Sequence, residues 1–184
     1  MRIAVTGGIA SGKSTILQML RERGISTLSS DALARDVLWD RAVQEQLMRQ
    51  FATDEPVTPV LLKSLLMEGD ENRRAINHIL HPAIAQEIDH SAALAVEVPL
   101  LFETCLQTSF EAIWVAKCSR EIQLSRLRDR YGIRAEFDQI SWQLDSKVAS
   151  TFADAIIETG GTPEQTLESL LQEAKSWGFT LVVS

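Results

Sequence analysis

The stretch that decides the fold is MRIAVTGGIASGKST, residues 1–15. Its apolar run at residues 3–5 is typical of a buried parallel strand. Residues 7–14 then fit the pattern of Gly, four residues and Gly-Lys-Ser/Thr, in which main-chain N–H groups wrap around a phosphate. A glycine-rich turn between a strand and a helix would need neither the lysine nor the hydroxyl. The stretch therefore predicts a phosphate-binding loop.

The residue types in this loop predict its chemistry. Gly7 and Gly12 allow backbone angles and a close approach that a side chain would forbid. Lys13 is expected to reach the β- and γ-phosphates of a nucleoside triphosphate, and Ser14, first in the next helix, offers a hydroxyl to Mg²⁺. The predicted nucleotide-binding residues are Gly7, Gly8, Ala10, Ser11, Gly12, Lys13, Ser14 and Thr15, with Ser14 as metal ligand.

Further strands are predicted along the chain, separated by helical patterns. They lie at residues 25–29, 92–98, 112–117 and 153–158, and 179–183 is a candidate edge strand. Residues 162–165, Thr-Pro-Glu-Gln, predict a capping box that begins the last helix. We expect an α/β fold of three layers with a five-stranded parallel sheet.

Residues 40–91 contain helical patterns without a good strand, broken at Pro56, Pro59, Gly69 and Pro82. We interpret them as an inserted helical lobe, with His81-Pro82 at a junction between helices. The predicted organisation is a single domain with a core of residues 1–39, 92–118 and 150–184, a substrate lobe of 40–91 and a lid of 119–149.

Composition limits the function classes. The chain has 184 residues, 45% apolar content and a formal net charge of −7, which argues against a broad nucleic-acid surface. No stretch approaches the length of a membrane span, and strand residues begin at once, so we expect no targeting signal. Cys105 and Cys118 are far apart in sequence, which suggests reduced thiols and a cytoplasmic location.

Two carboxylates have two interpretations each, and one pair of histidines is a candidate for metal binding. Asp31 is either the N-cap of a helix at 32–38 or a carboxylate facing the ligand crevice at the strand ends. Glu103 orients metal-bound water or a substrate hydroxyl, or is a solvated loop residue. His78 and His81 are three residues apart on a helix, but no further ligand stands at a suitable spacing for zinc.

The segment 117–134 is locally basic. Gln123, Arg126 and Arg130 fall on one helical face, and the two arginines repel each other unless an anion lies between them. We interpret the pair as a phosphate clamp, the alternative being a solvated face partly paired with Asp129. A turn at 131–133 and a helix at 135–146 would complete a lid that closes over the triphosphate.

Taken together, the chain resembles the dephospho-CoA kinase family. The resemblance rests on residues 5–15, Asp31 with Ala34-Arg35, Ile79-Leu80-His81-Pro82, Pro99-Leu100-Leu101-Phe102-Glu103, Gln123 with Arg126 and Arg130, Gln143, and Ala153-Asp154. This chain departs from the family pattern at three residues. Ser29 stands where the family usually has an aspartate, and Thr159 stands where the family has an asparagine near the adenine. Pro59 lies near the position of an arginine that the family tends to carry.

The resemblance implies transfer of the ATP γ-phosphate to the ribose 3′-hydroxyl of dephospho-CoA, with Mg²⁺, a helical CoA-binding insertion and a helical lid. It implies catalytic roles for Asp31 as general base and for Lys13, Arg126 and Arg130. It also implies a substrate-binding set of Asp31, His81, Pro99, Leu100 and Glu103. The expected partners are small molecules rather than nucleic acid or membrane, and we expect a monomer or weak oligomer. The alternatives are another small-molecule kinase with this loop and a non-catalytic ATP- or CoA-binding relative. A GTP-dependent switch would need an Asn-Lys-x-Asp segment, which the chain lacks.

Overall fold

The computed structural model describes residues 1–131 and 146–179. Residues 1–28 and 92–184 form one compact unit, the core unit, and residues 29–91 form a second, the helical unit. The elements are β1 (Ile3–Thr6), α1 (Lys13–Arg21), β2 (Thr27–Ser29), α2 (Ser30–Leu38), α3 (Arg41–Phe51), α4 (Pro59–Met67), α5 (Asp70–His90), β3 (Ala95–Glu97), the short 3₁₀ helix η1 (Leu106–Ser109), β4 (Ala112–Lys117), α6 (Arg120–Tyr131), α7 (Ser146–Thr151), β5 (Ala155–Glu158) and α8 (Pro163–Ser176).

A five-stranded sheet in the order β2-β3-β1-β4-β5 organises the core unit. β1 lies at its centre, pairs in parallel with β3 and β4, and is buried along its whole length. The parallel pairing of β4 with β5 extends the sheet on the other side. The predicted α/β fold with a five-stranded parallel sheet is confirmed.

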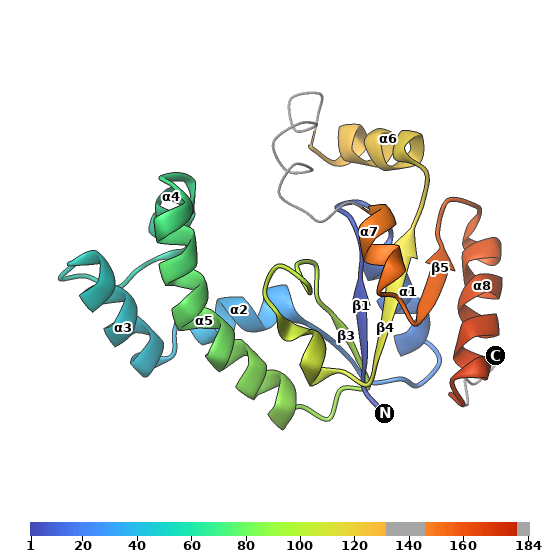
Figure 1. Ribbon diagram of the computed structural model, residues 1–184, viewed down its shortest axis with the longest axis horizontal. Coiled ribbons are helices and arrows are strands. Elements are labelled where there is room, and N and C mark those ends of the chain that lie inside the picture. The colour runs from blue at the N-terminus through green and yellow to red at the C-terminus, as the bar shows by residue number, and fades with distance from the viewer. Residues whose placement is uncertain (132–145, 180–184) are drawn as a thin grey trace. The chain divides into compact units, whose positions relative to one another are not determined.

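Helices cover both faces of this sheet (Figure 1). α1 and α8 contact each other and share one apolar cluster with the strands, in which Ile16, Leu20 and Leu170 pack against the fully buried Trp114. α7 contacts β4 and crosses in front of the sheet in Figure 1. The predicted capping box is confirmed, because Thr162 and Gln165 bond reciprocally at the start of α8. The sheet is thus a rigid support for the loops at its strand ends.

The helical unit is built around α5, which contacts α2, α3 and α4. Thr58 caps α4, whose first residue is Pro59, and Gly69 precedes α5, so these two predicted breaks are confirmed. The predicted junction at His81-Pro82 is wrong, because α5 runs through Pro82. A proline removes one donor from a helix, and the buried Leu80 and Ile84 on either side hold this helix in its packing.

The helical unit begins at residue 29, before the predicted start of the lobe at residue 40, since α2 packs against α5. Ser29, in extended conformation, is the N-cap of α2, and Asp31 lies in the first turn. Asp31 as an N-cap is therefore wrong. The predictions of a turn at 131–133, a helix at 135–146 and a tail strand at 179–183 fall mostly on residues 132–145 and 180–184, which lie outside the described residues.

Candidate functional site

The loop of residues 7–12 connects the central strand β1 to the N-terminus of α1. Gly7 has a φ of 137° and Gly12, the N-cap of α1, a φ of 95°. A Cβ on Gly7 would lie 2.5 Å from the Ala116 carbonyl oxygen, and one on Gly12 would lie 3.0 Å from the Thr159 Cβ. Both positions require glycine because conformation and space each exclude a side chain.

Lys13 lies over this loop rather than in solvent. Its ammonium group donates to the carbonyl oxygens of Gly7 at 2.8 Å and Gly8 at 2.9 Å, and its side chain is buried. The lysine is thus folded back against the loop beside the N-terminus of α1, where the helix dipole favours an anion. The buried Ser11 hydroxyl has no hydrogen-bond partner among the described residues. Buried polar atoms and a positive charge at a helix start together suit an anionic ligand.

Ser14 stands beside a carboxylate that the sequence analysis did not single out. Its hydroxyl donates to Oε1 of Glu97 at 3.2 Å, and Glu97 is the last residue of β3, the neighbour of β1. A carboxylate at the end of a strand beside the loop strand is a signal that was present in the sequence. Hydroxyl and carboxylate oxygens are the donors that Mg²⁺ takes from proteins, so this pair fits that ion.

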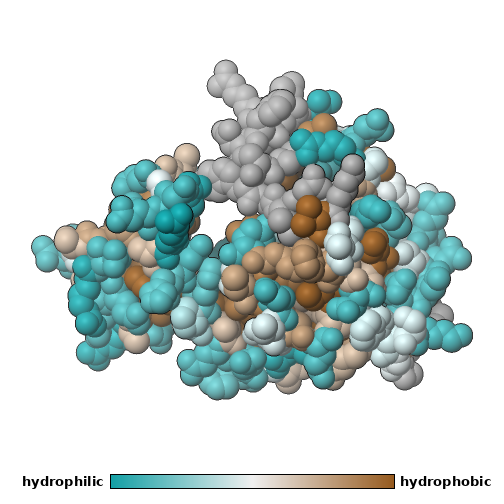
Figure 2. All heavy atoms as spheres, in the orientation of Figure 1, coloured by the Kyte–Doolittle hydropathy of each residue, from teal (hydrophilic) through white to brown (hydrophobic). Residues whose placement is uncertain are grey.

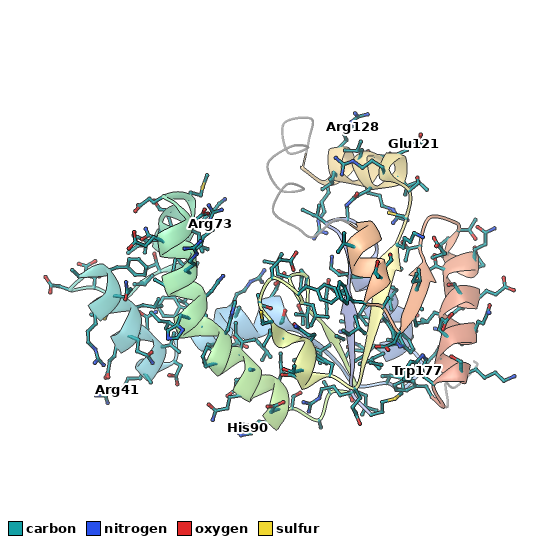
Figure 3. The ribbon with its side chains drawn as sticks, in the orientation of Figure 1. Arg41, Arg73, His90, Glu121, Arg128 and Trp177 are labelled. Atoms are coloured by element: carbon teal, nitrogen blue, oxygen red, sulfur yellow. The ribbon has the colours of Figure 1, made fainter. Side chains whose placement is uncertain are left out.

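Side chains from two other elements bind the loop from outside. Gln123 Nε2 donates to the Ile9 carbonyl at 2.7 Å, Arg126 Nη1 to the Ala10 carbonyl at 3.4 Å, and the Thr159 hydroxyl to the Ser11 carbonyl at 2.5 Å. Gln123 and Arg126 come from α6, whereas Thr159 follows β5. Figure 3 shows Glu121 and Arg128 of α6 pointing outward instead. One face of α6 therefore binds the loop. Two of the three residues predicted to share that face, Gln123 and Arg126, make these bonds.

Arg126 and Thr159 also border a small pocket of about 200 Å³ beside the loop. Gly12, Thr15, Gly161, Pro163 and Thr166 complete its lining. Arg126 Nη2 donates to the Thr159 carbonyl at 2.6 Å and so closes one side. Nearby, burial raises the pKa of the Cys118 thiol, although the Arg126 charge and the Thr159 hydroxyl oppose this. The pocket thus lies beside the phosphate loop, since Gly12 is part of its lining.

Arg130 and three of the predicted substrate-binding residues, Pro99, Leu100 and Glu103, differ in how far they are exposed. Arg130 is exposed on α6, one turn beyond Arg126. Pro99 is half-buried, and Leu100 and Glu103 are exposed on the segment that follows β3. The neighbouring Phe102 ring lies 5.7 Å from the Phe152 ring, and Figure 2 shows apolar surface over this side of the core unit, around α7. The segment thus carries a partly exposed apolar surface.

Asp31 and His81 belong to the helical unit. Asp31 is exposed two residues after the end of β2, and His81 is half-buried on α5, where burial lowers the pKa of its imidazole. The same unit carries an open groove of about 690 Å³ between α2, α3 and α5. Trp39, Val43, Ile79 and Pro82 give it an apolar wall.

No helix within residues 1–131 and 146–179 is long and apolar enough to cross a membrane. Among those same residues, no group of three or more His, Cys, Asp or Glu side chains is placed to hold a metal ion. Any Mg²⁺ bound at Ser14 and Glu97 would therefore need further oxygen ligands from phosphates and water.

The chain is similar to known proteins over nearly its whole length. The family model described as dephospho-CoA kinase matches residues 1–164. A dephospho-CoA kinase of Geobacillus kaustophilus is 31% identical, with 96% of each chain covered. One of Prochlorococcus marinus is 32% identical, with 85% of this chain and 86% of its own covered.

Solved structures share the fold. A Thermus thermophilus protein gives a TM-score of 0.82 at 24% identity, with 97% of each chain covered. The dephospho-CoA kinase of Campylobacter jejuni gives 0.61 at 19%, covering 95% of this chain and 96% of its own. A shikimate kinase of Acinetobacter baumannii gives 0.58 at 16%, covering 97% and 95%.

Proposed function

The chain belongs to the dephospho-CoA kinase family and is an ATP-dependent phosphotransferase acting on dephospho-CoA, and we propose how its own residues divide that work. The proposal is carried by the loop of residues 7–12, in which Lys13 lies over glycine carbonyls at the start of α1. We take the accepting atom to be the 3′-hydroxyl oxygen of the dephospho-CoA ribose.

The loop and Lys13 bind the triphosphate of ATP. In-line phosphoryl transfer depends on positioning and on neutralising charge, since little covalent chemistry falls to the protein. Lys13 exchanges its bonds with Gly7 and Gly8 for bonds with the β- and γ-phosphates. The pocket between Arg126 and Pro163 receives the adenine. Binding by Gly7, Gly8, Ala10, Ser11, Gly12, Lys13, Ser14 and Thr15 then holds the γ-phosphate in one orientation.

The oxygens of Ser14 and Glu97 suit Mg²⁺. Ser14 would be the direct ligand, and Glu97 would orient the Ser14 hydroxyl. When bound, the ion neutralises phosphate charge and orients the phosphate oxygens. Glu97 accepts the hydrogen bond of the Ser14 hydroxyl and so keeps the Ser14 lone pairs directed away from the carboxylate.

Arg126 and Arg130 have separate tasks in this proposal. Two donors of the Arg126 guanidinium, Nη1 and Nη2, bind the Ala10 and Thr159 carbonyls, so this residue supports the loop and faces the phosphates with its remaining N–H groups. Arg130 is the exposed cation that meets the developing charge on the transferred group when residues 119–149 close as a lid.

The acceptor is bound by Asp31, His81, Pro99, Leu100 and Glu103. Asp31 follows β2 by two residues, at the carboxyl end of a strand, which is where ligands of such sheets bind. It takes the proton of the attacking hydroxyl, and a loose transition state with late proton transfer asks little basicity of it. The groove walled by Trp39 and Pro82 suits the amide-linked, largely apolar arm of the acceptor. We place the enzyme in the cytoplasm as a monomer or weak oligomer.

The test is a coupled assay of ADP release with ATP and Mg²⁺, run with and without dephospho-CoA. We expect ADP release that depends on dephospho-CoA, and a product that carries a new 3′-phosphate by ³¹P NMR. Nucleosides and shikimate serve as competing acceptors. Lys13→Ala is the control and should abolish release. Release that prefers another acceptor, or that Lys13→Ala leaves intact, would contradict the proposal.

A further inference from the structure

Three consecutive carbonyls of the phosphate loop are each bound by a side chain from elsewhere in the core unit. Ile9, Ala10 and Ser11 accept from Gln123, Arg126 and Thr159 respectively. In a trans peptide the C=O of one residue and the N–H of the next point in opposite directions. Each of these bonds therefore also fixes where the N–H of Ala10, Ser11 or Gly12 points.

The three N–H groups, of Ala10, Ser11 and Gly12, differ in what they bind. The Ser11 N–H donates within the loop to the Gly8 carbonyl at 3.1 Å. The N–H groups of Ala10 and Gly12 point away from the Ile9 and Ser11 carbonyls that Gln123 and Thr159 bind. Loop donors that are already oriented do not lose conformational freedom when phosphate binds, so affinity rises.

Thr159 is the best-placed of the three side chains. It is 2% exposed, and its hydroxyl lies 2.5 Å from the Ser11 carbonyl and 2.9 Å from the Lys117 carbonyl at the end of β4. Its main-chain N–H also donates to Lys117, at 2.8 Å, and its own carbonyl accepts from Arg126. The hydroxyl has one proton, and the shorter distance assigns it to Ser11.

Thr159 also fills the space beside Gly12. Its Cβ, Cγ2 and Oγ1 lie 3.0 to 3.2 Å from the position that a Cβ on Gly12 would take. The residue thus joins the loop, the sheet and α6, and borders the small pocket at the same time. A side chain that only lined the pocket would need neither the hydroxyl nor the contact with Gly12.

We propose that Thr159 is a positioning residue, which holds the phosphate loop ready for the triphosphate through its hydroxyl bond to Ser11. This rests on the proposed role of the loop in binding ATP. Thr159 touches no reacting atom in this account; it acts through the loop. Gln123 acts in the same way on the Ile9 carbonyl, from the partly exposed α6.

The test compares the binding of ATP with that of adenosine, which has the base and ribose but no phosphate. Thr159→Val keeps the shape of the side chain and removes the hydroxyl. By calorimetry we expect ATP affinity to fall roughly tenfold, the scale of a lost bond to a buried acceptor. Adenosine affinity should not change, and Thr159→Ser should restore ATP affinity.

Thr166→Val is the matched control, since Thr166 is a buried threonine of the same pocket and, among the described residues, donates to no loop carbonyl. It should leave the ratio of the ATP and adenosine affinities unchanged. Gln123→Met, on α6, keeps the test open if Thr159→Val does not fold, and it should lower ATP affinity alone.

Equal losses for ATP and adenosine in Thr159→Val, or wild-type ATP affinity in it, would overturn the inference. If Thr159→Val does not fold, unchanged ATP affinity in Gln123→Met would do the same. A wild-type chain that binds no ATP would instead refute the proposed function, so the two failures are distinguishable.

Discussion

Replacing Gly7 by alanine isolates the steric demand of the phosphate loop. A Cβ at this position would stand 2.5 Å from the Ala116 carbonyl oxygen and 2.9 Å from the Ser11 hydroxyl, whereas real Cβ atoms stay beyond 3.0 Å. The Ala116 carbonyl belongs to β4, which is paired on both sides, with β1 and with β5. The loop must therefore move by at least the missing 0.5 Å, because the strand cannot.

Conformational strain adds to this displacement. Gly7 has a φ of 137°, which L-residues with a side chain rarely adopt. Forcing alanine into this conformation costs about 1–3 kcal/mol. With the displacement, we expect a loss of about 2–4 kcal/mol in the free energy of unfolding, which is above the average cost of a single substitution. At a urea m-value of about 2 kcal/mol/M, the midpoint of unfolding would fall by about 1–2 M.

Gly24→Ala is the matched control for Gly7→Ala. Gly24 also has a positive φ, 83°, but a Cβ there would meet nothing within 4 Å. It should cost only about 1 kcal/mol and leave ATP binding unchanged. Urea unfolding and ATP calorimetry on both variants measure the difference. If Gly7→Ala is as stable as Gly24→Ala and binds ATP like wild type, the close approach of the loop to β4 is not the reason that glycine is required at position 7.

Three other outcomes are expected. Glu97→Gln should raise the Mg²⁺ concentration for half-maximal activity roughly tenfold, as losing an outer carboxylate does, and an unchanged Mg²⁺ titration would count against the Ser14–Glu97 pair. Asp31→Asn should lower kcat about 10²–10⁴-fold with an unchanged dissociation constant for ATP, and near-normal turnover in a quenched-flow assay would remove Asp31 as general base. Burial lowers the pKa of His81, so the unfolded chain binds its proton first, and stability should fall as pH drops below about 6.5. His81→Gln should flatten this fall in urea unfolding at pH 8 and 5.5, whereas the exposed His78→Gln should not.

The sequence was informative where one local rule decides a structure. The loop of residues 7–14 has residue types that no other local structure requires, and β1, the strand before it, is a short apolar run. Pro82 shows where local rules fail. A proline weakens a helix by a few kcal/mol, but α5 buries Ile76, Leu80, Ile84 and Ile88 along one face, and this burial offsets the missing bond. Tertiary packing of that kind is invisible to a scan for breaks.

Thr159 and Glu97 show what residue patterns leave out of a site. Thr159 follows β5, which neighbours β4, and Glu97 is the last residue of β3, which neighbours β1. Their partners, Ser11 and Ser14, lie far away in sequence. Only the strand order brings them to the loop. The sequence shows Thr159 only as a departure from the family pattern, whereas in the structure its hydroxyl lies 2.5 Å from the Ser11 carbonyl of the loop and 2.9 Å from the Lys117 carbonyl. A substitution beside a phosphate site therefore has to be judged by the bond that the new residue forms, since a threonine here donates to the loop carbonyl and packs against Gly12 at once.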